Sequence, residues 1–211
     1  MHIIYVQVKF QKNIICVIKG VKMYQFEEKE IRKNKTNIFV RKCITEALFS
    51  LLEKHDFEDI SITDIIKKAG VSRMGFYRNY SSKEDVIEKF ILEKFIETIN
   101  EIKAKRQLNF HINNIMITTL KNFQKFSNYI KLFLDKNLDA LLYKCYHNAY
   151  YSLYNIKKNN RIHQYSNEMF IGELFNLEMC WLKNGMKESP EELARIYGYI
   201  MKLRISTNNL T

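Results

Sequence analysis

The stretch from residue 72 to residue 80, SRMGFYRNY, concentrates side chains that can donate hydrogen bonds to an anionic or polar partner. Guanidinium groups present a planar fork that matches phosphate and guanine, while hydroxyls and amides bind single oxygen atoms. So many donors are atypical of a helix that is meant to be buried. The chemistry indicated is recognition of a polar surface, and its candidate donors are Ser72, Arg73, Arg78, Asn79 and Tyr80.

Motifs for catalysis or metal binding do not occur in the sequence. It has no Gly-rich phosphate loop, no His-Glu-x-x-His and no Gly-x-Ser-x-Gly, and its five His are scattered. The four Cys lack Cys-x-x-Cys spacing, so we expect small apolar residues in a reducing compartment, with a redox-sensing thiol as the alternative. We expect no catalytic residue, metal or cofactor. An enzyme site assembled only in three dimensions stays an alternative.

The composition favours a mostly helical protein. Only 6 Gly and 1 Pro occur in 211 residues, whereas 46% of residues are hydrophobic and 27% are charged. The longest charge-free run, residues 107–120, is too short and too polar for a membrane span. The net charge of +11 is spread as +4 over residues 1–22, −1 over 23–29, +2 over 30–95 and +6 over 96–211. The charge therefore marks no single region as a nucleic-acid surface.

Residues 1–35 are predicted to be an N-terminal extension. Residues 1–22 are apolar but are interrupted by Lys9 and Lys12 and lead to no cleavage site, unlike a signal peptide. We hypothesise that translation begins at Met23, the alternative being a loose N-terminal arm.

From Thr36 onward the apolar period is helical. Ile44, Ala47, Leu48, Leu51 and Leu52 form one stripe of the first helix. The predicted helices are 36–54, 61–69, 72–80, 82–105, 109–126, 128–135, 138–158, 164–184 and 190–205.

Residue types at the helix ends support these assignments. Ser61 with Asp64 predicts a capping box, and Ser72 predicts a second N-cap. Gly70 is predicted to take a positive φ in the turn between them, and Gly185 to end the helix that precedes another capping box at residues 189–192. Two short helices joined by such a turn describe a helix-turn-helix, although an ordinary helical corner has the same spacing.

The stretch DISITDIIKKAGVSRMGFYRNYSSKED, from Asp59 to Asp85, resembles the N-terminal DNA-binding domain of the TetR/AcrR family of bacterial transcriptional regulators. The resemblance extends over about 55 residues; the stretch 181–194 is similar to the ending of one C-terminal class of that family. It implies an all-α fold with a three-helix helix-turn-helix domain at 36–82 (motif 61–80), followed by a larger helical ligand-binding and dimerisation domain at 83–211.

The function implied by the resemblance is sequence-specific regulation of transcription in the bacterial cytoplasm. We expect a repressor that binds double-stranded DNA at a palindromic operator as a homodimer and is released by a small effector, with the helix at 82–105 transmitting the change. An activator role is equally compatible with the sequence. The alternative from another class is an all-α ligand-binding or protein-interaction module that has lost specific DNA recognition.

Roles at the DNA follow from the positions that match the family. Tyr77 and Lys83 match phosphate contacts, and Arg73 can bind guanine. Where the family commonly has Gly-Thr, this chain has Met74 and Gly75. We expect Met74 to contact a thymine methyl group, whereas Gly75 lacks a base-facing side chain. The predicted DNA-binding residues are Ser61, Thr63, Ser72, Arg73, Met74, Gly75, Tyr77, Asn79, Tyr80 and Lys83.

The helix at 164–184 carries two apolar strips, so we expect one of them to form a dimer interface together with the helix at 190–205. The alternative is that both strips pack within one chain. The predicted interface residues are Phe170, Leu174, Leu177, Trp181, Ile196 and Ile200.

A small aromatic or drug-like effector would suit a pocket lined by aromatic and polar side chains. The alternative is that these side chains serve packing. The candidate pocket residues are His111, Asn114, Tyr143, Tyr146, His147, Tyr150 and Trp181.

Overall fold

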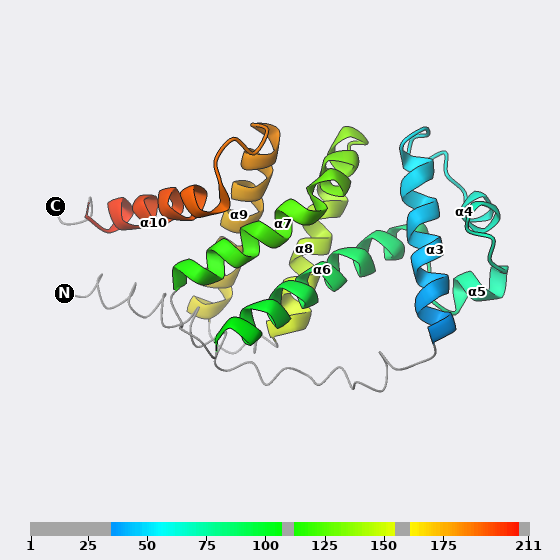
Figure 1. Cartoon of the computed structure of the whole chain (residues 1–211), viewed down its shortest axis with the longest axis horizontal. Coiled ribbons are helices and arrows are strands. Elements are labelled where there is room, and N and C mark those ends of the chain that lie inside the picture. The colour runs from blue at the N-terminus through cyan, green and yellow to red at the C-terminus, as the bar shows by residue number, and fades with distance from the viewer. Residues whose placement is uncertain (1–34, 107–111, 155–160, 207–211) are drawn as a thin grey trace. The chain divides into compact units, whose positions relative to one another are not determined.

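The computed structural model describes residues 35–106, 112–154 and 161–206 (Figure 1). The predicted N-terminal extension, the Met23 start and His111 lie outside these residues. Within the described ranges the protein is all-helical, with eight helices and no strand. They are α3 (Lys35–Leu52), α4 (Ile62–Ala69), α5 (Arg73–Tyr77), α6 (Lys83–Arg106), α7 (Ile112–Asp135), α8 (Asp139–Tyr154), α9 (Arg161–Lys183) and α10 (Pro190–Ser206).

The described residues form two compact units, and α6 and α7 each contribute to both. The N-terminal unit consists of residues 35–95 and 128–152, and the C-terminal unit of the remaining described residues. The predicted domain boundary at residue 82 falls at the N-terminus of α6 and stays a prediction. None of the described helices is both long and apolar enough to cross a lipid bilayer.

An aromatic cluster forms the centre of the N-terminal unit. The ring of Phe49 in α3 lies 4.9 Å from that of Phe90 in α6, 5.2 Å from that of Phe133 and 5.0 Å from that of Tyr129, both in α7. Such edge-on and tilted pairs add about 0.5–1.5 kcal/mol each to the burial of the rings. The predicted stripe of α3 faces inward, with four of its five residues buried and Leu51 half-buried.

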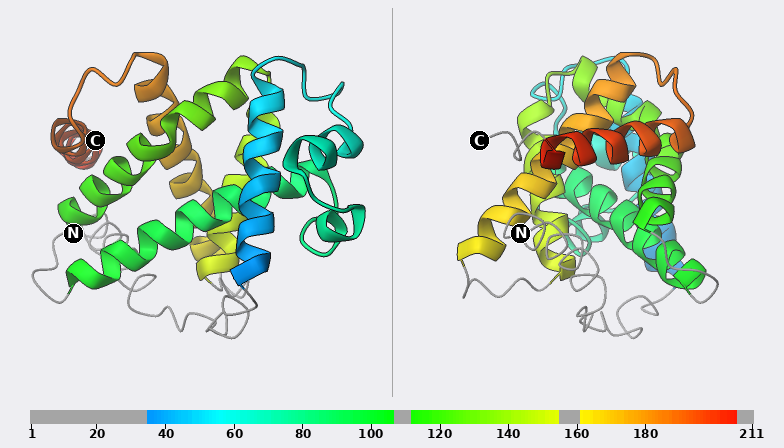
Figure 2. Two further views of the ribbon diagram at one scale, coloured as in Figure 1. Left: turned by 45° about the vertical axis from the view of Figure 1, so that its right-hand side comes forward. Right: turned by 90° about the vertical axis from the view of Figure 1, so that its left-hand side faces the viewer.

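The helices α4 and α5 pack against α3 and against each other, as the views in Figure 2 also show. Ile65 from α4 and Phe76 from α5 are fully buried. The two helices have only 8 and 5 residues, too few to be stable alone in water, so this burial holds them in place.

The prediction of separate helices at 109–126 and 128–135 was wrong, because α7 runs without a break through Ser127. The Ser127 hydroxyl, which could have ended the helix, donates to the carbonyl oxygen of Gln124 at 2.9 Å, inside the helix itself. The buried side chains of Phe126 and Ile130 continue the apolar period across the expected break.

In the C-terminal unit, Trp181 is a core residue with only 2% of its surface exposed. Its ring lies 6.3 Å from that of Phe123, and its indole N–H donates to the carbonyl oxygen of Glu188 at 3.1 Å. The predicted helix ends around it are confirmed. Gly185 has φ +78° after α9, and Ser189 and Glu192 exchange capping-box hydrogen bonds at the start of α10.

Among the cysteines, Cys145 is buried in the N-terminal unit. Burial, and then the nearby Glu88 carboxylate, raise the pKa of its thiol to about 12. The thiol therefore stays protonated at neutral pH, which disfavours the redox-sensing alternative for this residue.

A polar cluster joins α6 to α7 in the C-terminal unit. The Glu101 carboxylate accepts hydrogen bonds from Lys105 Nζ at 2.7 Å, Asn122 Nδ2 at 2.9 Å and Lys125 Nζ at 3.3 Å. The hydrogen bond from Lys105, followed by that from Asn122, lowers the pKa of Glu101 to about 2 from an ordinary value of 4.5.

A pair of substitutions in α5 tests which of its side chains supports the fold. Phe76→Ala is expected to lower the free energy of unfolding by about 3–5 kcal/mol, because it leaves a cavity at a fully buried position. Met74→Ala, at a side chain that is 71% exposed, is expected to change it by less than about 0.5 kcal/mol. Urea unfolding followed by far-UV circular dichroism measures both, and equal effects would contradict the assignment of an inner and an outer side.

The Glu101 cluster predicts a dependence of stability on pH. Because the folded-state pKa lies below 4.5, the stabilisation is fully present above that pH and is lost as the pH falls towards about 2. Glu101→Gln is therefore expected to flatten the decline of the urea midpoint between pH 5 and pH 2, whereas the control Glu53→Gln, at an exposed position, leaves it unchanged. Parallel curves for wild type and Glu101→Gln would show that the cluster contributes nothing.

Candidate nucleic-acid interface

The start of α4 is set by a capping box, as predicted. The Ser61 hydroxyl accepts the backbone N–H of Asp64 at 3.2 Å, and the Asp64 carboxylate accepts the backbone N–H of Ser61 at 3.1 Å. The hydrogen bonds from Ser61, first that of its side chain, lower the pKa of Asp64. A negative charge thus persists in the first turn of α4, where the helix dipole favours it.

The turn between α4 and α5 also has the predicted geometry. Gly70 has φ +64°, a left-handed conformation that disfavours side chains, and the N–H of Val71 bonds back to the carbonyl oxygen of Ile66 at 3.3 Å. Ser72 then caps α5 by accepting the N–H of Gly75 at 2.9 Å. Together these contacts give the helix-turn-helix that the spacing predicts.

The second helix of the motif is shorter than the predicted range 72–80, because α5 ends at Tyr77. The Asn79 side chain donates to the carbonyl oxygen of Gly75 at 2.8 Å, and the N–H groups of Asn79 and Tyr80 both bond to the carbonyl oxygen of Phe76. A side-chain amide thus satisfies a carbonyl that another helical turn would have used. Asn79 is half-buried as a result.

The outer side of α5 carries three exposed side chains of different chemistry. Met74 is 71% exposed, Tyr77 is 48% exposed, and the Arg73 guanidinium lies 5.9 Å from the Tyr77 ring. We call these three residues the outer face of α5. Other exposed donors from α4, α5 and their caps are Ser61, Thr63, Lys67, Lys68, Ser72 and Arg78.

Lys67 and Lys68 were not singled out in the sequence, and Arg78, although named as a candidate donor, was not among the predicted DNA-binding residues. Their charges were visible in the sequence, and a helical period started at the Ser61 cap would have placed both lysines in the last turn of α4.

Two predicted contact positions do not lie on this exposed surface. Tyr80 is 3% exposed, and its hydroxyl lies 3.3 Å from that of Thr45 in α3. A Cβ atom at Gly75 would lie 3.2 Å from Ser72 Oγ and 4.0 Å from Val40 Cγ1, so this position is directed towards the turn and α3. The lack of a side chain at position 75 therefore affects the packing of α5 against the turn and α3 more directly than it affects contact with a base.

The ammonium group of Lys83, a predicted phosphate contact, is engaged inside the protein. It donates to the carbonyl oxygens of Phe57, of Glu58 at 3.2 Å and of Ile60 at 3.0 Å, in the loop that precedes α4. It also lies 4.4 Å from the centre of the Phe57 ring.

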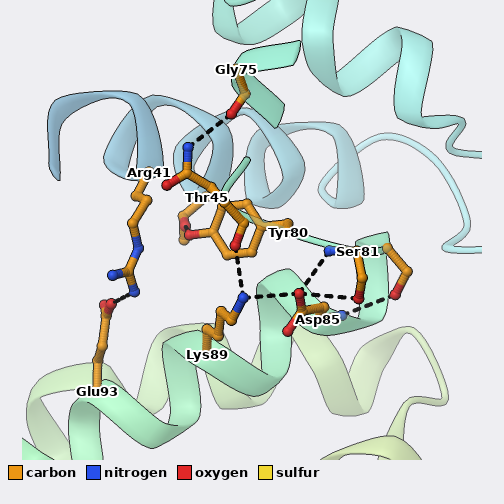
Figure 3. A network of polar contacts seen from close by, with 10 residues as sticks. Arg41, Thr45, Gly75, Tyr80, Ser81, Asp85, Lys89 and Glu93 are labelled. Atoms are coloured by element: carbon orange, nitrogen blue, oxygen red, sulfur yellow. Dashed lines mark hydrogen bonds and ion pairs between the residues drawn. The ribbon is translucent and has the colours of Figure 1, made fainter. Parts of the chain in front are cut away.

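A polar network fastens the end of the motif to α6 (Figure 3). Lys89 Nζ donates to the carbonyl oxygen of Asn79 at 2.7 Å and to the Asp85 carboxylate at 3.0 Å, and the same carboxylate accepts the N–H of Ser81 at 2.8 Å. An ion pair between Arg41 and Glu93 links α3 to α6 beside it.

The predicted pocket residues are divided between the two units. In the N-terminal unit Tyr146 and Tyr150 are buried, Tyr143 is 37% exposed, and the half-buried His147 ring lies 4.5 Å from that of Tyr151. Exposed Asn114 and buried Trp181 belong to the C-terminal unit, so the pocket as a whole stays a prediction.

The predicted interface residues differ in exposure. Ile196 and Ile200 of α10 are exposed, whereas Trp181 is in the core of its unit and is left out of the interface proposed below. The other three, Phe170, Leu174 and Leu177, are half-buried. Exposed apolar side chains that the prediction did not include are Tyr165, Met169 and Tyr199.

Comparison with known proteins places the motif in a family. Residues 44–90 match the sequence pattern described as bacterial regulatory proteins, tetR family. An uncharacterized HTH-type transcriptional regulator of Bacillus subtilis (strain 168), YxbF, is 30% identical over 76 residues, which are 36% of this chain and 20% of that protein. The HTH-type dhaKLM operon transcriptional activator DhaS of Lactococcus lactis subsp. lactis (strain IL1403) is 28% identical over 67 residues, 32% of this chain and 36% of that protein.

These matches span well under two thirds of either relative. Over a longer range, the crystal structure of Lin0861 from Listeria innocua has a TM-score of 0.66 at 18% identity and covers 81% of this chain and 93% of its own. That likeness shows a shared fold. The matched segment includes the second half of α3, the capped helix-turn-helix and the first turns of α6, and over these residues the chain is similar to the tetR family of bacterial regulatory proteins.

Proposed function

We propose that the protein is a sequence-specific DNA-binding regulator of transcription that acts as a repressor, bound as a homodimer to a palindromic operator. The observation that carries this proposal is the outer face of α5, which presents a guanidinium, a thioether and a phenol on a helix whose opposite side is buried. A major groove admits such a helix, where arginine binds guanine and apolar groups contact the thymine methyl.

Exposed donors around the outer face support a second kind of contact. Hydroxyl and ammonium groups bind phosphate oxygens. Such groups are exposed on α4 and at the helix caps of the motif, in Ser61, Thr63, Lys67, Lys68 and Ser72. Phosphate contacts supply most of the affinity and fix the register of the motif on the duplex, while base contacts supply the sequence preference.

Activation is the second candidate, because the relative DhaS is named as an activator. A promoter–reporter fusion separates the two modes. Loss of reporter signal when the intact protein is supplied supports repression, and a gain supports activation. A variant with Arg73→Ala serves as the control in both cases.

We also propose that a small aromatic effector binds near α8. The support is the group of aromatic side chains there, with Tyr143 partly exposed and the His147 ring tilted against that of Tyr151 at 4.5 Å. A ligand that binds the folded state raises its melting temperature. A thermal-shift screen of aromatic compounds, repeated with Tyr143→Ala, tests this part of the proposal independently of DNA binding.

Substitutions on the outer face are expected to separate base contacts from phosphate contacts. Arg73→Ala is expected to weaken binding to the specific site by about 1–3 kcal/mol, roughly 5- to 160-fold in Kd, with a smaller effect on unrelated DNA. Tyr77→Phe removes only a hydroxyl and is expected to weaken both by a similar factor, because a phosphate contact is independent of sequence. The measurement is fluorescence anisotropy with a fragment from upstream of the protein's own gene and with a scrambled duplex.

The control for this experiment is Lys131→Ala, at an exposed position in α7 outside the motif. If Arg73→Ala weakened binding to both duplexes equally, the arginine would contact phosphate only. If the wild-type protein bound the two duplexes equally, selection of bound genomic fragments would decide between an operator elsewhere and a motif without specificity.

The exposed side of α10 predicts the dimer surface. Ile196, Tyr199 and Ile200 follow the i, i+3, i+4 spacing of one helix face, and all three are exposed in the single chain. Ile200→Glu is expected to raise the dimer dissociation constant at least about 100-fold, because an unpaired buried charge costs about 3–5 kcal/mol. Light scattering coupled to size exclusion measures the mass, with Lys187→Glu as a control; a variant that stays dimeric would move the interface elsewhere.

A further inference from the structure

The Lys83 ammonium has every one of its donors occupied within the protein. An ammonium group carries three N–H donors and no acceptor, and it meets three carbonyl oxygens, those of Phe57, Glu58 and Ile60. Lys83 is the first residue of α6, and its ammonium group also lies over the Phe57 ring. A phosphate oxygen could bind here only by displacing one of these carbonyls.

The loop that Lys83 binds is the segment that positions α4. Phe57 and Ile60 are both buried, and Ile60 directly precedes the Ser61 cap from which α4 begins. The carbonyl oxygens of Phe57, Glu58 and Ile60 converge on one cation, so their positions relative to α6 depend on it. The bonded residues are 23–26 positions apart in the sequence, which makes this a tertiary anchor.

A second lysine of α6 anchors the other end of the motif. Lys89 binds the carbonyl oxygen of Asn79, just after α5, and its charge is balanced by Asp85. The motif between the two anchors consists of helices of 8 and 5 residues that cannot hold an orientation by themselves. The first two turns of α6 therefore hold the motif at both ends.

We propose that Lys83 is a positioning residue for DNA recognition and not a phosphate ligand: it holds the loop 57–60, and through it α4 and the outer face of α5, at a fixed orientation on α6. This inference rests on the proposed function. The sequence resemblance implies a different role for this lysine, namely a phosphate contact. Lys83 occupies the matching position, but its N–H donors bind backbone carbonyl oxygens of the protein itself.

The decisive variant is Lys83→Arg. Arginine keeps the charge and binds phosphate at least as well as lysine, but its planar fork cannot direct three donors at three converging carbonyl oxygens. A positioning lysine is therefore not replaced by arginine, whereas a phosphate ligand is. Lys83→Met, which keeps the apolar stem over Phe57 and removes the donors, is the second variant, and Lys131→Arg is the matched control at an exposed site.

Two measurements are made on each variant. The first is the urea midpoint by circular dichroism, and the second is the Kd for the upstream fragment and for a scrambled duplex across a salt series. For Lys83→Arg we expect a lower midpoint and a lower ratio of specific to non-specific affinity, with the wild-type slope of log Kd against log salt concentration. A purely structural role would lower the midpoint of the folded protein without changing that ratio.

Three results would overturn the inference. Wild-type affinity and ratio in Lys83→Arg, together with a slope reduced by about 0.9 in Lys83→Met, would identify a phosphate ligand. An unchanged midpoint in both variants would show that the carbonyl contacts do not anchor the loop, and a lowered midpoint with an unchanged ratio would limit Lys83 to stability. If the wild-type protein bound neither the upstream fragment nor any selected genomic fragment specifically, the proposed function would be refuted, and the positioning role with it.

Discussion

The whole candidate interface depends on the attachment of two very short helices to longer ones. Thirteen helical residues in α4 and α5 have almost no stability of their own, so their orientation derives from burial against α3 and against each other. Ile65 and Phe76 supply that burial, and Gly70 supplies the sharp change of direction. The surface offered to a partner is therefore only as well defined as the packing behind it.

Polar contacts add a second level of definition to this packing. Apolar burial is non-directional, and it leaves a short helix free to slide or rotate by small amounts. The carbonyl groups of residues 57, 58, 60 and 79 remove that freedom, because each accepts a hydrogen bond from a lysine fixed on α6. The ion pair between Arg41 and Glu93 ties α3 to the same helix, so all the elements of the motif have α6 as their common support.

Much of this structure could be predicted from the sequence, because its signals are local. The capping boxes at Ser61 and Ser189 and the turn at Gly70 depend on residues within three or four positions of one another. The helical stripe of α3 is periodic and was equally visible. The solvent exposure of each side chain was harder to predict, because a tyrosine such as Tyr80 can be either exposed or buried.

The sequence was least informative where a contact distant in sequence, or a side chain competing with the backbone, determines the local structure. Lys83 meets carbonyl groups more than twenty residues away, and nothing in its own neighbourhood indicates them. Asn79 shortened α5 by binding the carbonyl of Gly75, whereas Ser127 left α7 intact by bonding within the helix. The same residue types can end a helix or continue it, and tertiary packing decides which occurs.

The division of α5 into an inner and an outer side has a consequence for how the protein can change over evolutionary time. Arg73, Met74 and Tyr77 contribute little to the core, and Phe76 contributes nothing to the exposed surface. Substitutions of Arg73 and Met74 are therefore expected to have little effect on the core, whereas the Tyr77 ring lies 5.4 Å from that of Phe76 and couples the two sides. New sequence preferences can be acquired on this scaffold one exposed residue at a time, without first accumulating a reserve of stability to tolerate them.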